Sequence, residues 1–133
     1  MNNNTLYNLA VTAAQKSYSK YSGYSVGAAL LCNDGSIFTG CNIENSSYGA
    51  TVCAERTAFF KAISEGKTDF KELVICTLRN GELMDNSFLP CGICRQVMCE
   101  FCSENFVVSI ISKDSVKQFT LSQLLPSGFI LGE

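Results

Sequence analysis

The chain has 133 residues, 47% of them hydrophobic, which is enough for one compact domain with its own core over residues 1–133. Its ten basic and twelve acidic residues give a net charge of −2, and no stretch is rich in Lys or Arg. This balance argues against a nucleic-acid partner and favours a small-molecule substrate.

Histidine is absent, which removes Ser-His and Cys-His nucleophilic machinery and the most common general base. No signal-peptide pattern opens the chain, and no apolar stretch is long enough to span a bilayer. We therefore expect a cytoplasmic protein with no membrane partner. Its eight cysteines are expected to be free thiols or metal ligands instead of disulfides.

The first half of the chain predicts a helix followed by a β-hairpin. Apolar residues recur at helical spacing from about Thr5 to Ser19, and residues 18–25 break that period as an ordered loop. Apolar runs at Val26–Cys32 and Ser36–Asn42 flank the turn residues 33–35, which indicates a hairpin. The polar segment Ile43–Val52 is then expected to be a loop.

The second half alternates helices and strands, which predicts one α/β domain with a mixed sheet and helices on its faces. Pro90 is expected to occupy the first position of its helix, where the missing N–H costs nothing. Gly66 is expected to stop the helix that precedes it. The expected elements are a helix at Cys53–Ile63, a strand at Leu73–Leu78, a loop at Arg79–Leu89, a helix at Pro90–Phe101, a strand at Phe106–Ser112, an edge strand at Gln118–Thr120 and a short segment at Leu121–Leu125.

Two cysteine motifs fall at predicted helix starts. They are Cys53-Ala54-Glu55-Arg56 and Pro90-Cys91-Gly92-Ile93-Cys94. A helix N-terminus favours a thiolate, and Cys91 and Cys94 share one side of the first turn. A structural zinc site has four protein ligands, whereas a catalytic site leaves one position open for water. Three thiolates from Cys53, Cys91 and Cys94 therefore predict a hydrolytic zinc centre with one ion per chain.

Two side chains beside the predicted ligands have chemistry that such a centre needs. Glu55 is close enough to reach the open position without being a ligand, so it can move protons as a general acid and base. Arg56 can donate to the sulfurs and offset the surplus negative charge of three thiolates. The alternative for Arg56 is a solvated helix residue.

A four-cysteine structural site is the main rival, because Cys99 and Cys102 form a second C-x-x-C. If residues 91–102 are helical, however, Cys91 and Cys102 lie about 16 Å apart along the axis, too far to share one ion. The cysteines outside the two motifs are then expected to be small core residues. These are Cys32, Cys41, Cys76, Cys99 and Cys102.

Over essentially its whole length the chain resembles the homotetrameric cytidine deaminases of pyrimidine salvage. The resemblance implies a three-layer α/β/α sandwich with a five-stranded mixed sheet. It also implies zinc-dependent hydrolysis of cytidine and 2′-deoxycytidine to the uridines and ammonia, with zinc at the three cysteines and Glu55 as proton shuttle. The segments that carry it are Tyr21-Ser22 to Tyr24 with 26–30, then 40–45, 53–58, 90–97 and 124–126 with Phe129.

The resemblance also implies a substrate pocket. Asn42 and Glu44 would hold the ribose 3′-hydroxyl, and the Ala54 N–H would meet the base carbonyl. For Asn42 and Glu44 the residues alone favour strand-end capping and a solvated loop. Tyr24 stands where the family usually has Phe against the pyrimidine, so its hydroxyl needs a partner or a path to water.

Two further aromatic residues are implied to act across subunits. Tyr48 and Phe129 match positions that reach a neighbouring subunit's site in the tetramer, and the alternative is that both are core aromatics.

Three other functions compete with cytidine deamination. The chain could act on another aminopyrimidine, such as a nucleoside antibiotic, or on a polynucleotide, which the missing basic channel disfavours. It could also be a zinc-stabilised interaction module without catalysis.

Overall fold

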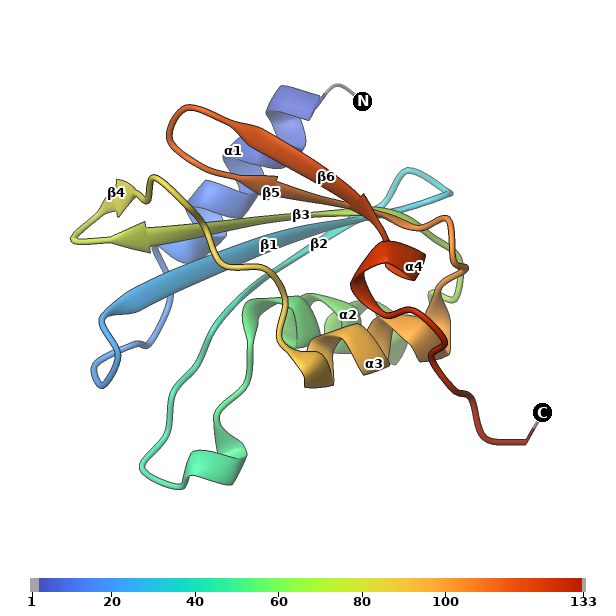
Figure 1. Ribbon diagram of the computed structural model, residues 1–133. Coiled ribbons are helices and arrows are strands. Elements are labelled where there is room, and N and C mark those ends of the chain that lie inside the picture. The colour runs from blue at the N-terminus through green and yellow to red at the C-terminus, as the bar shows by residue number, and fades with distance from the viewer. Residues whose placement is uncertain (1–2, 133) are drawn as a thin grey trace.

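A computed structural model, which describes residues 3–132, shows a mixed β-sheet with helices on both faces (Figure 1). Residues 1, 2 and 133 of the predicted domain lie outside the described part. Within it, the elements are α1 (Asn3–Ala14), β1 (Tyr24–Cys32), β2 (Ile37–Cys41), a 3₁₀ turn η1 (Tyr48–Ala50), α2 (Ala54–Ser64), β3 (Phe70–Arg79), β4 (Glu82–Leu83), α3 (Gly92–Phe101), β5 (Val107–Ile111), β6 (Val116–Thr120) and α4 (Leu121–Leu124).

The sheet has the strand order β2-β1-β3-β5-β6. Strands β3 and β5 are parallel, because α3 lies on the connection between them, and the other pairs are antiparallel. The predicted hairpin is confirmed as β1 and β2, and the predicted edge strand is confirmed as β6. The short strand β4 also pairs with β3, so the sheet has one more strand than the five expected.

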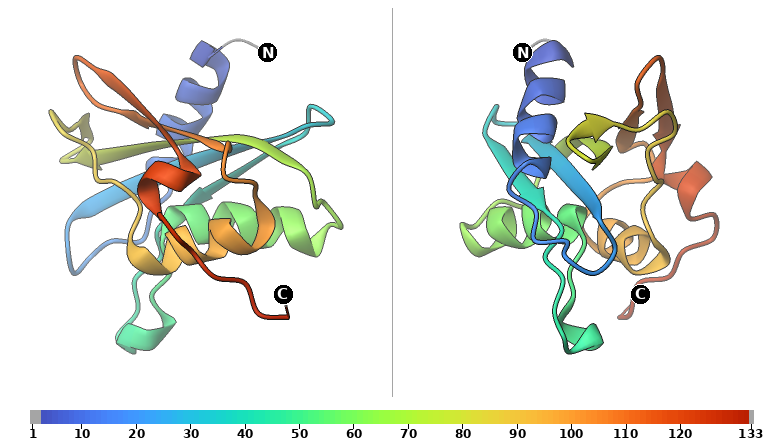
Figure 2. Two further views of the ribbon diagram at one scale, coloured as in Figure 1. Left: turned by 45° about the vertical axis from the view of Figure 1, so that its right-hand side comes forward. Right: turned by 90° about the vertical axis from the view of Figure 1, so that its left-hand side faces the viewer.

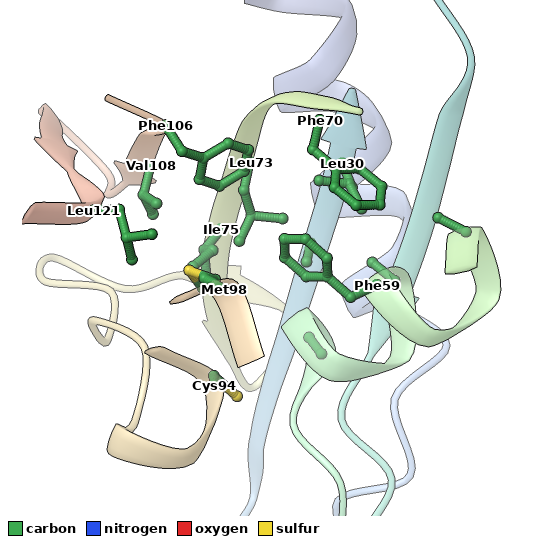
Figure 3. Packing of buried hydrophobic residues seen from close by; sticks show 14 of the residues in the cluster. Leu30, Phe59, Phe70, Leu73, Ile75, Cys94, Met98, Phe106, Val108 and Leu121 are labelled. Carbon is green, nitrogen blue, oxygen red and sulfur yellow. The ribbon is translucent and has the colours of Figure 1, made fainter. Parts of the chain in front are cut away.

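The helices cover opposite faces of this sheet, which confirms the three-layer α/β/α sandwich (Figure 2). Alternate residues of β1 and β3 point to each face. On one face, α1 buries Leu6, Ala10 and Ala14 against the sheet. On the other, α2 and α3 pack around Phe59 and Met98, as Figure 3 shows. Within residues 3–132, no helix combines the length and the apolar character that crossing a membrane requires.

Several boundaries differ from the sequence-based expectations, and three of them change how the chain is read. Helix α1 ends at Ala14 and not at Ser19, because Tyr18 already pairs with Ile43 in a parallel bridge. Strand β1 begins at Tyr24, inside the predicted loop. Pro90 does not open α3, because Cys91 is the extended N-cap residue and the helix begins at Gly92.

The predicted loop at 79–89 contains β4, which the sequence interpretation missed. Asn80 and Gly81 have φ values of 54° and 79°, which allow a two-residue turn between β3 and β4. Positive φ at both central residues is the requirement of the turn type that Asn-Gly favours in hairpins. The dipeptide was therefore the available signal for this strand.

Gly40 allows α2 to lie unusually close to the sheet. A Cβ atom at this position would be 2.6 Å from the backbone nitrogen of Ala58 and would also collide with the carbonyl oxygen of Ala54. Both are backbone atoms of α2, so only movement of the helix could relieve the contact. The absence of a side chain at Gly40 therefore sets where α2, and the Cys53 residue that caps it, sit on the sheet.

We expect Gly40→Ala to lower the free energy of unfolding by about 1–3 kcal/mol, because overpacking a buried contact forces the helix outward. Denaturant unfolding measures this. Gly49→Ala is the matched control, because a Cβ at Gly49 meets open space and should change stability by less than about 0.5 kcal/mol. Equal stability of Gly40→Ala and the original protein would contradict the role of this contact.

Candidate metal centre and adjoining pocket

Three cysteine sulfurs meet where α2 and α3 begin. Cys53 is the N-cap of α2, Cys91 is the N-cap of α3, and Cys94 lies in the first turn of α3. The Sγ atoms of Cys53 and Cys91 are 3.6 Å apart, those of Cys91 and Cys94 are 3.5 Å apart, and all three lie within 4.8 Å of one another. The geometry thus brings together the three cysteines that the sequence predicted.

The rival four-cysteine arrangement is not what the structure shows. Among the residues described, the cysteine cluster able to hold a metal contains Cys53, Cys91 and Cys94 alone. Cys102 caps the opposite end of α3, and burial raises the pKa of its thiol to about 12. The Cys99 sulfur faces the carbonyl oxygen of Phe129. Cys99 therefore contacts the C-terminal segment, and Cys102 packs against the hydrophobic core.

The local electrostatics favour a thiolate at Cys53. The Cys94 thiol lowers the pKa of Cys53 through a hydrogen bond, and the Arg56 guanidinium lowers it further. The same bond to Cys53 raises the pKa of Cys94, so one thiolate forms at the expense of the other when no cation is present. A divalent cation would remove this competition, because a coordinating thiol is deprotonated by the metal itself. The donor set therefore fits a thiophilic cation such as zinc.

Arg56 lies where the predicted charge compensation requires it. Its Nη2 atom is 3.4 Å from the Cys53 Sγ atom, so it is not the solvated helix residue of the alternative interpretation. Its buried Nε atom has no hydrogen-bond partner within residues 3–132. The guanidinium is thus held beside the sulfurs, where positive charge stabilises thiolates.

Glu55 is a buried carboxyl group in the first turn of α2, only 4% exposed, and it lines the cavity beside the sulfurs. Burial raises the pKa of Glu55 to about 7, and the negative charge of Cys53 acts in the same direction. A carboxyl group with this pKa can accept and release a proton near neutral pH. In a chain without histidine, this property is otherwise hard to obtain.

The cavity next to the cluster has a volume of about 280 Å³. Most of the surface that lines it is apolar, with a few polar groups, as in small-molecule sites. Its wall includes many of the residues predicted to bind substrate, catalyse or hold metal: Tyr24, Asn42, Glu44, Cys53, Ala54, Glu55 and Cys91.

Asn42 has the capping role that its sequence context suggested. Its side-chain oxygen accepts hydrogen bonds from Ser17 Oγ at 2.6 Å and from the Val26 N–H at 2.8 Å. Its side-chain nitrogen donates to the Tyr24 carbonyl at 2.9 Å. The residue therefore ties three segments together, and it lies in the cavity wall as well.

Glu44 is held by the loop that precedes β1. Its carboxylate accepts hydrogen bonds from the backbone N–H groups of Tyr21 and Ser22 and from the Ser22 hydroxyl. Burial opposes the charged form, but these bonds more than offset it, so the pKa of Glu44 lies below its usual value. Glu44 thus lies in a partly exposed loop, as the alternative interpretation expected, but its carboxylate is fixed by hydrogen bonds at the cavity wall.

Tyr48 and Phe129 lie outside this cavity. Tyr48 is 87% exposed and Phe129 is 63% exposed, so the alternative in which both are core aromatics is wrong. The Phe129 carbonyl accepts a hydrogen bond from Gln96 Nε2 at 3.0 Å, which fixes the C-terminal segment against α3.

Phe88 and Leu89 line the cavity although the sequence interpretation left them in a loop. They follow Ser87, whose buried hydroxyl accepts from the Thr77 N–H and donates to the Ile111 carbonyl. These bonds attach the segment to the ends of β3 and β5, directly before the Cys91 motif. The only sequence signal for these two cavity-lining residues was that they form an apolar pair directly before the motif with the predicted metal ligands.

Comparison with known proteins gives consistent results. Residues 1–110 match the family model described as the cytidine and deoxycytidylate deaminase zinc-binding region. The cytidine deaminase of Sporosarcina psychrophila is 47% identical over 88% of this chain and 83% of its own length. That of Halalkalibacterium halodurans is 42% identical over 97% of this chain and 95% of its own.

A solved structure agrees with the fold. The crystal structure of cytidine deaminase from Burkholderia pseudomallei superposes with a TM-score of 0.86 at 38% identity, covering 97% of this chain and all of the other. The three-thiol cluster, the buried Glu55 beside it and these matches lead to one conclusion: the chain belongs to the cytidine and deoxycytidylate deaminase family.

Proposed function

We propose that this protein is a zinc-dependent cytidine deaminase. It hydrolyses cytidine and 2′-deoxycytidine to uridine and 2′-deoxyuridine and releases ammonia. The observation that carries the proposal is a cluster of three thiols, two of which line a small apolar cavity, with one buried carboxyl group in the same cavity wall. Relatives that carry the name cytidine deaminase align over most of the chain.

Cys53, Cys91 and Cys94 would hold the zinc ion, one per chain, with Arg56 offsetting their negative charge. Zinc held there supplies a Lewis acid that makes a water molecule nucleophilic near neutral pH. Three sulfur ligands would leave one zinc coordination position open, which would distinguish this set from a closed structural site with four protein ligands.

Glu55 would carry the protons of the reaction. It takes one proton from the attacking water and delivers it to N3 of the pyrimidine, and then takes the proton of the new C4 hydroxyl group and delivers it to the departing amine. A bond forms between C4 and the water oxygen, and the bond between C4 and the exocyclic amino nitrogen breaks, so cytidine and water become uridine and ammonia. The buried position of Glu55 at the cavity wall supports this role, because the carboxyl group lies among the residues that would surround the base.

The remaining cavity residues would orient the nucleoside. Glu44 is already fixed by three hydrogen bonds and has acceptor capacity left for a ribose hydroxyl. Asn42 borders the same region, and Tyr24 provides an aromatic wall for the base. The Ala54 backbone N–H lies in the first turn of α2, where N–H groups have no partner within the helix and can meet the base carbonyl.

The active species would be a homotetramer, in which Tyr48 and Phe129 complete a neighbouring pocket. Both side chains are well exposed, and further large apolar side chains are exposed on the same chain, among them Ile93 and Leu131. So many exposed large apolar side chains favour a surface that is covered by other copies of the chain. A cavity of about 280 Å³ is also small for enclosing a nucleoside without help. The cytoplasmic location and the single domain over 1–133 stay predictions.

Glu55→Gln tests the proposed chemistry. We expect kcat for cytidine to fall by about 10²–10⁴-fold, because the amide cannot move the protons. Zinc content and fold should be unchanged. Activity is measured by the absorbance change as cytidine becomes uridine, and zinc by elemental analysis.

Glu65→Gln is the matched control, since it makes the same change at an exposed position at the far end of α2. Activity of Glu55→Gln within about tenfold of the original protein would remove Glu55 from the mechanism. An original protein that binds zinc but does not deaminate cytidine would favour another aminopyrimidine substrate or a non-catalytic module.

Phe129→Ala tests the assembly. We expect KM for cytidine to rise about tenfold with zinc retained, because truncating an anchoring aromatic at an interface is costly. Light scattering should give the mass of four 14.5 kDa chains for the original protein. Val116→Ala, an exposed apolar residue on the edge strand β6, should change KM little. A monomer with full specific activity on dilution would show that each chain builds its own pocket.

A further inference from the structure

Tyr24 and Arg79 form a cross-strand pair at the end of the sheet. They are direct register partners at the first residue of β1 and the last residue of β3. Directly opposed residues of an antiparallel pair place their side chains on the same face, close enough to interact. This is the face on which Val26, Leu73 and Ile75 pack against α2 and α3.

The two side chains make two kinds of contact. The Arg79 guanidinium carbon lies 4.6 Å from the centre of the Tyr24 ring, and Arg79 Nη1 donates to the Tyr24 hydroxyl at 2.5 Å. The first contact is a cation–π interaction, and the second needs the hydroxyl group that tyrosine has and phenylalanine lacks. The ring is thus held both at its face and at its tip.

The position of this ring determines the shape of the cavity. Tyr24 and Phe88 both line the cavity, and their rings meet edge to face with centroids 4.8 Å apart and planes at 74°. The two rings come from β1 and from the segment before α3. Because Arg79 restrains Tyr24, it also restrains this aromatic corner of the cavity wall.

Arg79 is itself positioned by the turn that follows it. Asn80 and Gly81 form the two-residue connection, and Arg79 is the register partner of Glu82 in β4. The side chain is exposed and does not line the cavity. It therefore touches the ring from outside the cavity.

We propose that Arg79 is a positioning residue for substrate binding, which acts on the nucleoside through Tyr24. This inference rests on the proposed function. Holding the ring in one orientation before substrate arrives removes part of the ordering cost of binding. The restraint should affect KM much more than kcat, because Arg79 does not line the cavity and acts only on the orientation of a ring that moves no proton in the reaction.

Four proteins test the proposal: the original chain, Arg79→Met, Tyr24→Phe and the double variant. We expect Arg79→Met to raise KM for cytidine about threefold to tenfold, with kcat and zinc content within about twofold. In the Tyr24→Phe background the same substitution should raise KM by clearly less than it does in the original protein, because the hydroxyl that Arg79 holds is gone and only the cation–π contact remains to be lost. Lys71→Met removes the same charge at the exposed start of β3 and should leave KM unchanged.

The outcomes separate this proposal from the function on which it rests. A KM for Arg79→Met equal to that of the original protein, or equal effects in both backgrounds, would overturn the role of Arg79 while leaving deamination intact. If the original protein does not deaminate cytidine, the proposed function fails. The Tyr24–Arg79 contact is then tested with the same four proteins by denaturant unfolding. If the two single substitutions change the free energy of unfolding additively in the double variant, the contact is overturned, and a non-additive change supports it.

Discussion

The site depends on two helix N-termini that meet on one face of the sheet, each preceded by a cysteine. Cys53 and Cys91 are extended N-cap residues, so their sulfurs lie at the positive ends of α2 and α3, where thiolates are favoured. The Cys91 sulfur also accepts the backbone N–H of Cys94, so it satisfies part of the helix end while it stays in the cluster. The same residues therefore end the loops, begin the helices and form the cluster.

The rest of the fold fixes where these helix ends lie. Gly40 allows α2 to sit close to β2, which determines the position of Cys53. On the other side, Arg95 donates from Nε to the Pro90 carbonyl and from Nη1 to the Leu124 carbonyl, each at 2.7 Å. These bonds join the start of α3 to the C-terminal helix α4. The cluster thus rests on contacts with β2 on one side and with α4 on the other.

The burial of Glu55 is costly for folding and useful for chemistry. A carboxyl group that is 4% exposed is destabilised in its charged form, and no histidine is available to move protons in its place. Tyr24 and Glu44, by contrast, are held at the cavity wall by nearby hydrogen-bond donors. Arg79 donates to the Tyr24 hydroxyl, and the Tyr21 N–H donates to the Glu44 carboxylate. A rigid pocket around one titratable carboxyl group is what general acid–base catalysis requires.

Much of this was predictable from the sequence. Apolar periodicity indicated the helices and the hairpin, and the spacing of Cys53, Cys91 and Cys94 indicated the cluster, because helix starts constrain where such residues point. Other features depend on tertiary contacts that no local pattern records. The Arg79 partner of Tyr24 is 55 residues away in the chain, and Pro90 precedes the cap because Cys91 takes the capping position. Tyr48 and Phe129 are exposed in one chain, and the role proposed for them would depend on other copies.

The central claim is that three cysteines hold one zinc ion at the meeting point of α2 and α3. Elemental analysis of purified protein, combined with X-ray absorption at the zinc edge, tests it most directly. We expect one zinc per chain with three sulfur ligands, loss of the metal in Cys91→Ala, and full retention in the control Cys102→Ala. Four sulfur ligands, or zinc retained in Cys91→Ala and lost in Cys102→Ala, would contradict it.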